Sequence, residues 1–285
     1  MVRYSPPSEV SRASSPDRRA RRPAGSVTAN SRCGWRAAVG VAALAIAMVC
    51  TNAGAASSAG APVGVPVFTY HMVDRVLPAD RIGNALTITP EQFEAQLRAL
   101  ARLRVRTMTA SRLVDSLRRG AVPARTVVLT FDDGYANART FVLPLLERYH
   151  ATATFYVISS TIGTPRHLTW ADIRALRAAG NEIGAHGREH VDLTEMDAKG
   201  QLAQAQDCAR ALHRWANVVP VTYAYPSGRY NATTLAVMRR AGLAAAFTEE
   251  YGYANSLANP YRMPRIRILR ENAVPLFVAS IEALR

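Results

Sequence analysis

The sequence predicts a parallel α/β domain, either an open sheet or a closed barrel, because short β-like runs alternate with helix-like stretches from about residue 63 onwards. Seven runs rich in β-branched and aromatic residues supply the strands. They span residues 65–73, 126–131, 152–158, 182–185, 221–225, 245–248 and 265–269. Polar clusters directly follow several of these runs, and parallel α/β folds bind their ligands at the carboxyl ends of the strands. We therefore search for chemistry at these positions.

Helix patterns occupy the intervals between the strands. Residues 90–103 repeat apolar side chains at helical spacing, and Thr89 and Gln92 form a capping box at their start. Residues 170–179 follow a threonine cap and stop at a glycine, and three further stretches show the same periodicity. These are residues 197–215, 232–241 and 273–284. The stretch 249–261 contains glycine, asparagine and proline, and we expect it to be a surface loop.

The composition is that of a globular protein. Of the 285 residues, 49% are hydrophobic and 20% charged, which excludes disorder throughout. Three cysteines in this length exclude a disulfide-stapled mini-protein. The formal charge of +14 suggests a polyanionic partner, but residues 1–55 hold eight arginines against two acidic residues. The other arginines lie mostly on helix patterns without interleaved aromatic residues, so we expect no nucleic-acid partner.

The first 55 residues have the pattern of an export signal. A basic flank precedes an uncharged apolar run at 37–49, and the small residues Ala53-Gly54-Ala55 follow. We expect cleavage near Ala55, with an uncleaved, membrane-associated anchor as the alternative. The predicted domains are thus residues 1–55 for export and 56–285 for the folded domain, which would act in the periplasm, in the cell envelope or outside the cell. Cys208 would then be the remaining cysteine, and we expect it to be buried.

Two adjacent carboxylates, Asp132 and Asp133, follow the run 126–131 and precede Gly134. Neighbouring residues on a strand point to opposite faces, so both side chains reach one pocket only where the backbone bends. Glycine permits such a bend. Two acids this close repel each other unless a cation or a shared proton separates their roles. A solvated turn is an equally good interpretation of this segment alone.

Two histidines, His186 and His190, follow the run 182–185. Their spacing places both rings on one face if the segment turns helically, and this spacing suits a divalent metal. With one carboxylate from the first cluster they form a set of two histidines and one aspartate. Such a set leaves a position open for water, which is the arrangement of a catalytic metal site.

A third polar segment, Tyr225-Pro226-Ser227-Gly228, leaves the run 221–225 through a turn. A turn of this kind can aim backbone N–H groups, notably that of Ser227, at an oxyanion. Pro-x-Gly is also common in ordinary loops, so this segment alone does not indicate a catalytic role.

In order and spacing these segments resemble the NodB-type polysaccharide deacetylases, and among them the exported poly-β-1,6-N-acetylglucosamine deacetylases. The resemblance extends over residues 67–269 and rests on Thr130-Phe131-Asp132-Asp133-Gly134, on His186-x-x-x-His190 and on the Tyr-Pro-x-Gly turn. It implies a distorted (β/α)7 barrel in residues 56–285. It also implies a hydrolase that cleaves linear amide bonds, other than peptide bonds, in an acetylated polysaccharide such as a biofilm exopolysaccharide.

The resemblance further implies a divalent metal, with zinc as the first choice and cobalt or nickel as alternatives. By motif position, Asp133, His186 and His190 match the metal ligands. Asp132 matches the general base, and the N–H of Ser227 would hold the oxyanion.

Two departures from the family pattern concern the remaining catalytic groups. Many members carry an arginine where this chain has Ala224, and a catalytic histidine in a late strand, whereas the last histidine here is His213. The subgroup that acts on poly-N-acetylglucosamine instead has a Tyr-His near its N-terminus, which Tyr70-His71 matches. His71 is therefore the predicted general acid, and Arg265 is expected to orient the base in place of the missing arginine.

Two other functions remain open from the same residues. His186-Gly187-Arg188-Glu189-His190 fits the inverted zincin pattern H-x-x-E-H, which would make the protein a metallopeptidase with Glu189 as base. That pattern requires a long helix, whereas glycines interrupt this segment. The absent late histidine also allows a sugar-binding domain that has lost turnover. Which acetylated polymer is bound, and the oligomeric state, are left open.

Overall fold

The computed structural model describes residues 64–284. The predicted export segment 1–55 and its cleavage site lie outside the described residues. Within residues 64–284, no helix has both the length and the apolar character needed to cross a membrane.

Seven parallel strands form a closed barrel, which confirms the predicted (β/α)7 architecture. Around the ring the order is β1, β11, β9, β8, β7, β6 and β5, and β5 pairs with β1 to close it. The strands are β1 (Val65–Tyr70), β5 (Thr126–Phe131), β6 (Thr154–Val157), β7 (Glu182–Ala185), β8 (Thr222–Ala224), β9 (Ala245–Tyr251) and β11 (Met263–Arg267). Each of the seven predicted runs corresponds to one of these strands. Because all seven point the same way, their carboxyl ends meet at one mouth of the barrel.

Four short strands lie outside the ring. β4 (Arg106–Met108) extends the sheet beside β5, and β10 (Tyr253–Ala254) pairs antiparallel with β1. β2 (Met72–Val73) and β3 (Thr87–Ile88) form a separate parallel pair. None of the four was predicted as a strand of its own.

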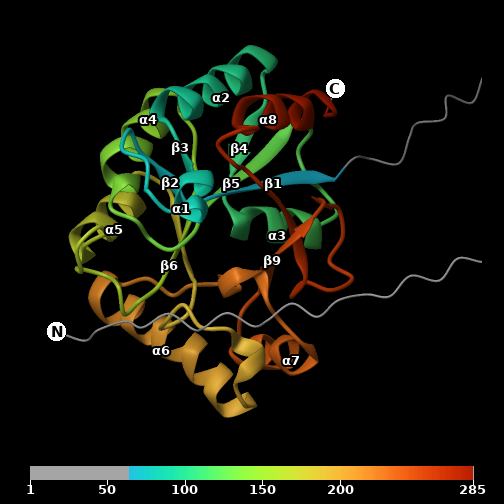
Figure 1. Cartoon of the computed structure of the whole chain (residues 1–285). Helices are drawn as coiled ribbons and strands as arrows, with labels where there is room; N and C mark the ends of the chain where they lie inside the picture. The colour runs from blue at the N-terminus through green and yellow to red at the C-terminus, as the bar shows by residue number, and fades with distance from the viewer. Residues whose placement is uncertain (1–63, 285) are drawn as a thin grey trace, which may run out of the picture. The chain divides into compact units, whose positions relative to one another are not determined.

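The helices surround the barrel (Figure 1), with α2, α4 and α8 drawn above the strands and α6 and α7 below them. They are α1 (Arg81–Leu86), α2 (Pro90–Leu103), α3 (Ala110–Arg118), α4 (Leu143–Arg148), α5 (Trp170–Ala178), α6 (Ala198–Ala216), α7 (Ala232–Arg240) and α8 (Ala273–Glu282). Short π- and 3₁₀-helical turns cover Ala138–Val142, Leu193–Glu195 and Pro226–Gly228. The capping box predicted at Thr89 and Gln92 is present at the start of α2.

Two predicted boundaries are wrong in ways that matter for the site. The run 65–73 is divided, because β1 ends at Tyr70 and β2 begins at Met72, so His71 lies at the carboxyl end of β1. The predicted loop 249–261 begins inside a strand, because β9 continues to Tyr251.

Stacked aromatic rings fill the core beside the barrel. The Phe131 ring lies 4.9 Å from that of Tyr70 and 5.1 Å from that of Phe155, in parallel arrangements, and Phe93 of α2 meets Phe131 edge-on. Such pairs add about 0.5–1.5 kcal/mol each beyond the burial of their surface. The packed barrel strands thus give a rigid support to the residues at their carboxyl ends.

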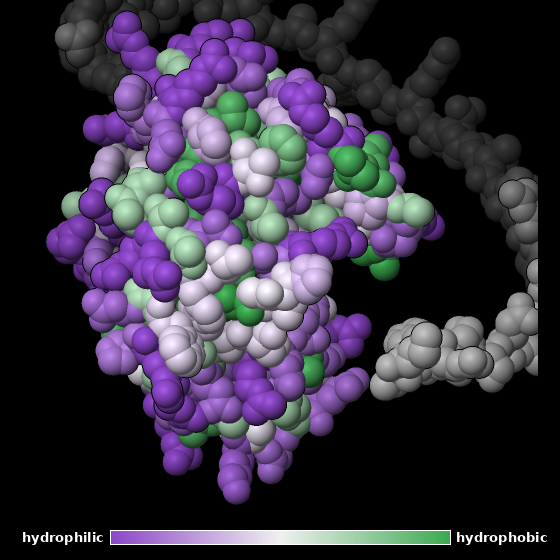
Figure 2. Space-filling model, turned by 90° about the vertical axis from the view of Figure 1, so that its left-hand side faces the viewer, coloured by the Kyte–Doolittle hydropathy of each residue, from purple (hydrophilic) through white to green (hydrophobic). Residues whose placement is uncertain are grey.

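On one side of the molecule, apolar residues are scattered among hydrophilic ones rather than gathered in a single patch (Figure 2).

Candidate active site

The β5 strand delivers Asp132 and Asp133 to the mouth of the barrel. The Asp132 N–H donates to the Tyr70 carbonyl at 2.9 Å, which ties the end of β5 to β1. The backbone then bends, because Asp133 and Gly134 have φ of 71° and 74°. A Cβ at Gly134 would lie 3.2 Å from the Val157 side chain, so a larger residue would be crowded as well as strained. This bend allows both carboxylates to face one site.

The β7 strand delivers His186, and a sharp turn brings back His190. The His186 N–H donates to the Val157 carbonyl at 3.0 Å. Residues 186–190 are not helical, because Gly187 has φ of 95°, and a Cβ there would lie 2.9 Å from the Glu189 carbonyl. The two imidazole rings still meet, with centroids 5.4 Å apart. A glycine turn therefore replaces the helical turn that the histidine spacing suggested.

Asp133, His186 and His190 form a compact cluster. Asp133 Oδ1 lies 3.3 Å from His186 Nε2 and 3.7 Å from His190 Nε2. One ligand atom from each residue lies within 4.8 Å of the others, a separation at which they could hold a single metal ion. The His186 side chain is 2% exposed and that of His190 is 44% exposed, so the cluster opens to solvent on the His190 side.

Hydrogen bonding around the cluster fits a cation. His186 Nδ1 lies 2.8 Å from the Ala224 carbonyl. A carbonyl oxygen only accepts, so Nδ1 carries a proton, and Nε2, which faces Asp133, is the ring nitrogen that a metal would bind. Asp133 Oδ1 is buried and has no hydrogen-bond partner among the described residues. A divalent cation between Asp133 Oδ1 and His186 Nε2 would bind both atoms.

Asp133 is held in the charged form that a metal ligand requires. Burial alone would raise its pKa. The nearby His186, whose Nε2 lies 3.3 Å from Oδ1, and smaller contributions from His71 and His190 outweigh burial and hold the pKa of Asp133 well below its ordinary value.

Asp132 forms a buried ion pair with Arg265 beside this cluster. Arg265 Nη1 donates to Asp132 Oδ1 at 2.9 Å, and Nη2 donates to Oδ2 at 2.7 Å. The two side chains are 0% and 2% exposed. Such a bidentate fork fixes the plane of the carboxylate. Burial alone would raise the pKa of Asp132. The charge of Arg265, and to a smaller extent that of His186, outweighs burial, so the pKa of Asp132 lies below its ordinary value.

His71 and Ser227 lie on separate segments at the same mouth of the barrel. The charge of His71 acts on both Asp132 and Asp133, and His71 Nδ1 is buried without a hydrogen-bond partner within residues 64–284. Ser227 lies in the turn that follows β8, with φ of 55°. The structure thus pairs Asp132 with Arg265 and groups the three predicted metal ligands, while Ser227 stands on a turn of its own.

Two further residues, Tyr135 and Glu249, lie near these groups. The Tyr135 ring stacks on His167 with centroids 5.3 Å apart, and burial together with Asp133 raises the pKa of Tyr135 to about 12. Glu249, near the end of β9, binds Arg265 and Arg267. Glu249 directly follows the predicted run 245–248, as Asp132 follows the run 126–131, so the strand-end rule could have selected it. It was missed because residues 249–261 were expected to be a surface loop.

Comparison with known proteins agrees with this geometry. Residues 119–246 match the family described as polysaccharide deacetylase. The chain carries a polysaccharide deacetylase domain. The matched segment includes the aspartate pair, both histidines of the cluster and the turn at Ser227, and the enzyme class predicted from the resemblance is confirmed.

Relatives of this deacetylase are found among both sequences and solved structures. YxkH of Bacillus subtilis, which is named as a polysaccharide deacetylase, is 27% identical over 225 residues, covering 79% of this chain and 78% of YxkH. A poly-β-1,6-N-acetyl-D-glucosamine N-deacetylase of Staphylococcus aureus is 24% identical over 197 residues, covering 64% of this chain and 68% of that protein.

Among solved structures, the Streptococcus pyogenes deacetylase PplD in complex with acetate superposes with a TM-score of 0.72 at 28% identity, covering 78% of this chain and 99% of PplD. IcaB from Ammonifex degensii superposes with a TM-score of 0.68 at 24% identity, covering 77% and 97%, and at that identity supports the fold alone.

Proposed function

We propose that the protein is a metal-dependent hydrolase that removes N-acetyl groups from a cell-envelope or extracellular polysaccharide. One observation carries the proposal. A cluster able to hold a metal, made by Asp133, His186 and His190, lies at the same mouth of the barrel as the buried, bidentately held Asp132. Three protein ligands leave a coordination position for water or substrate, as hydrolytic metal sites require.

The roles of the residues follow from their positions. A divalent metal at this cluster, zinc by preference, would polarise the acetyl carbonyl and lower the pKa of a water molecule towards about 7. Asp132 would accept a proton from the attacking water at a carboxylate oxygen, and Arg265 keeps that carboxylate ionised and oriented. The Ser227 N–H would donate to the developing oxyanion, and one such donor is typically worth about 3 kcal/mol. His71 would protonate the departing amine nitrogen.

The metallopeptidase alternative conflicts with the geometry of residues 186–190. An inverted zincin places its two histidines and its glutamate on one helix. Here the segment turns at Gly187, and the Glu189 carboxylate already accepts hydrogen bonds from Gln204 Nε2 at 3.1 Å and from Arg188 Nη2 at 3.3 Å. Glu189 is therefore poorly placed to act as the base.

For the substrate we propose poly-β-1,6-N-acetylglucosamine. Support comes from the Staphylococcus aureus relative, whose name gives that polymer, and from the position of His71 at the end of β1. We also propose that residues 1–55 direct export and that residues 56–285 form the catalytic domain. Mass measurement of the mature N-terminus tests this division, and a start near Ala56 is the expected result.

A panel of acetylated polymers tests the function and the substrate together. The purified protein is incubated with metal and poly-β-1,6-N-acetylglucosamine, chitin oligomers, peptidoglycan glycans or acetylated xylan, and released acetate is measured. We expect the highest kcat/KM on the first polymer. Acetate release from another polymer alone would contradict the proposed substrate. Absence of acetate release from all of them would support a sugar-binding domain without turnover. If the protein cleaves casein and Glu189→Gln loses that cleavage, the result would instead support the metallopeptidase function.

A further inference from the structure

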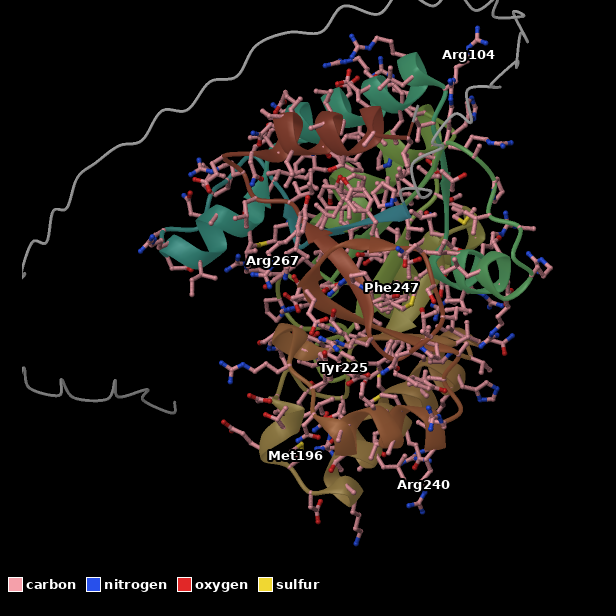
Figure 3. The ribbon with its side chains drawn as sticks, turned by 90° about the vertical axis from the view of Figure 1, so that its right-hand side faces the viewer. Arg104, Met196, Tyr225, Arg240, Phe247 and Arg267 are labelled. Carbon is pink, nitrogen blue, oxygen red and sulfur yellow. The ribbon has the colours of Figure 1, made fainter. Side chains whose placement is uncertain are left out.

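Strand β9 departs from regular pairing where it passes the site. Met263 of β11 pairs with Phe247, but Arg265 pairs with Tyr251, so two steps along β11 correspond to four along β9. Bulges are rare between parallel strands and are found next to active sites, where they redirect a side chain. Figure 3 shows this region, with Phe247 labelled on β9 and Arg267 on the neighbouring β11.

The irregular stretch directs Glu249 at the arginine that holds Asp132. Glu249 Oε1 accepts from Arg265 Nη2 at 2.5 Å, and Oε2 accepts from Arg267 Nε at 2.6 Å. The Glu249 side chain is 11% exposed. Arg265 Nε donates to the Thr248 carbonyl at 2.9 Å, a group that the interrupted pairing leaves available. The bulge thus supplies Arg265 with two acceptors, one of them charged.

The stem of Glu249 also touches the turn that carries Ser227. A Cβ at Gly228 would lie 2.5 Å from Glu249 Cβ and 2.6 Å from its Cγ, so only glycine allows the turn to approach this closely. Gly228 has φ of 68°, a conformation that L side chains rarely adopt. Glu249 therefore contacts two groups that serve different parts of the proposed reaction, the arginine behind the base and the turn with the oxyanion donor.

We propose that Glu249 is a positioning residue for deacetylation, an inference that rests on the proposed function. Through Arg265 it fixes the orientation of Asp132, and through Gly228 it fixes the turn that presents the Ser227 N–H. Glu249 would act through these two groups rather than on the substrate itself. A glutamine in its place has one acceptor oxygen instead of two, so Arg265 or Arg267 loses its partner. Arg265 would keep its bonds to Asp132, Thr130 and Thr248 but lose the negative charge behind it, so its guanidinium would shift relative to Asp132.

The test compares Glu249→Gln with wild-type enzyme on the polymer that wild type turns over fastest. We expect kcat to fall roughly 10- to 100-fold, the effect of displacing a reacting group by about 1 Å, with KM within about twofold of wild type and metal content unchanged. Glu94→Gln is the matched control, because Glu94 on α2 also binds two arginines, Arg98 and Arg148, and its side chain is 21% exposed. It should lower the free energy of unfolding and leave kcat unchanged.

Arg267→Gln provides a second route if Glu249→Gln does not fold. Arg267 is 44% exposed, so its loss leaves the core intact while removing one of the two partners of Glu249. We expect a smaller fall in kcat at constant KM. Wild-type kcat in the folded variants of Glu249 and Arg267 would overturn the inference, as would an equal fall in Glu94→Gln. Absence of acetate release by wild type is a separate outcome, which would overturn the proposed function itself.

Discussion

Asp132 and Asp133 are neighbours in sequence, yet their carboxylates have different partners. Asp132 faces a guanidinium that is always charged, and Asp133 faces two imidazoles. The first arrangement favours a carboxylate that stays ionised and fixed in orientation, and the second favours a metal ligand. The division follows from the bend at Asp133, since two consecutive residues on a regular strand would point to opposite faces.

At the residue scale, we predict that Asp132→Asn abolishes acetate release while the protein keeps its bound metal. Asparagine has nearly the same shape, so the fold and the three ligands remain, but its amide does not accept a proton from water. Acetate release and metal content are measured on the same samples. Retained turnover would contradict the role of Asp132 as base, and loss of metal would mean that Asp132 belongs to the ligand set.

At the scale of elements, a half-exposed cluster joins β9 to the segment that follows β8. Glu250 accepts from Arg262 Nε at 2.9 Å and from the Tyr230 hydroxyl at 2.6 Å. The hydrogen bond from Arg262 is the main cause that lowers the pKa of Glu250 below its ordinary value, with Tyr230 adding to it. Because the folded pKa is the lower one, the contribution of Glu250 to stability is complete above the unfolded pKa and is lost as pH falls through the folded pKa.

We predict that Arg262→Gln moves the titration midpoint of Glu250 upwards, towards its ordinary value. The midpoint is measured by NMR from the side-chain carboxyl carbon. Arg239→Gln is a suitable control, because Arg239 lies over the Tyr261 ring and does not bind Glu250. An unchanged midpoint in Arg262→Gln would show that the ion pair does not form in solution.

The elements also show which parts of the fold a sequence can specify. The ring strands were predicted because most of their residues are buried, most clearly in Thr126–Phe131, where all six are buried and most are β-forming. β4 was missed because its three residues range from exposed to buried and show no apolar run. Glu249 was missed because the glycine, asparagine and proline of residues 249–261 predicted a surface loop, whereas strand β9 continues to Tyr251.

At the scale of the whole molecule, the site exists because the barrel closes. Pairing of β1 with β5 brings His71 to the aspartates, and β11 returns from the far end of the chain to place Arg265 behind Asp132. Strand-end positions could be predicted from the sequence, since parallel strands share one edge. The bidentate pair, the contact of His186 with the Ala224 carbonyl and the bulge in β9 depend on distances between strands remote in sequence, and no local pattern predicts them.

The central claim is that this barrel is a metal-dependent deacetylase, and metal removal with restoration tests it most directly. Acetate release from acetylated poly-β-1,6-glucosamine is measured for the purified protein, after chelation, and after one equivalent of zinc is returned. We predict that activity disappears with the metal, returns with it, and that His186→Ala neither binds the metal nor recovers activity. Full acetate release by the metal-free protein would contradict the account.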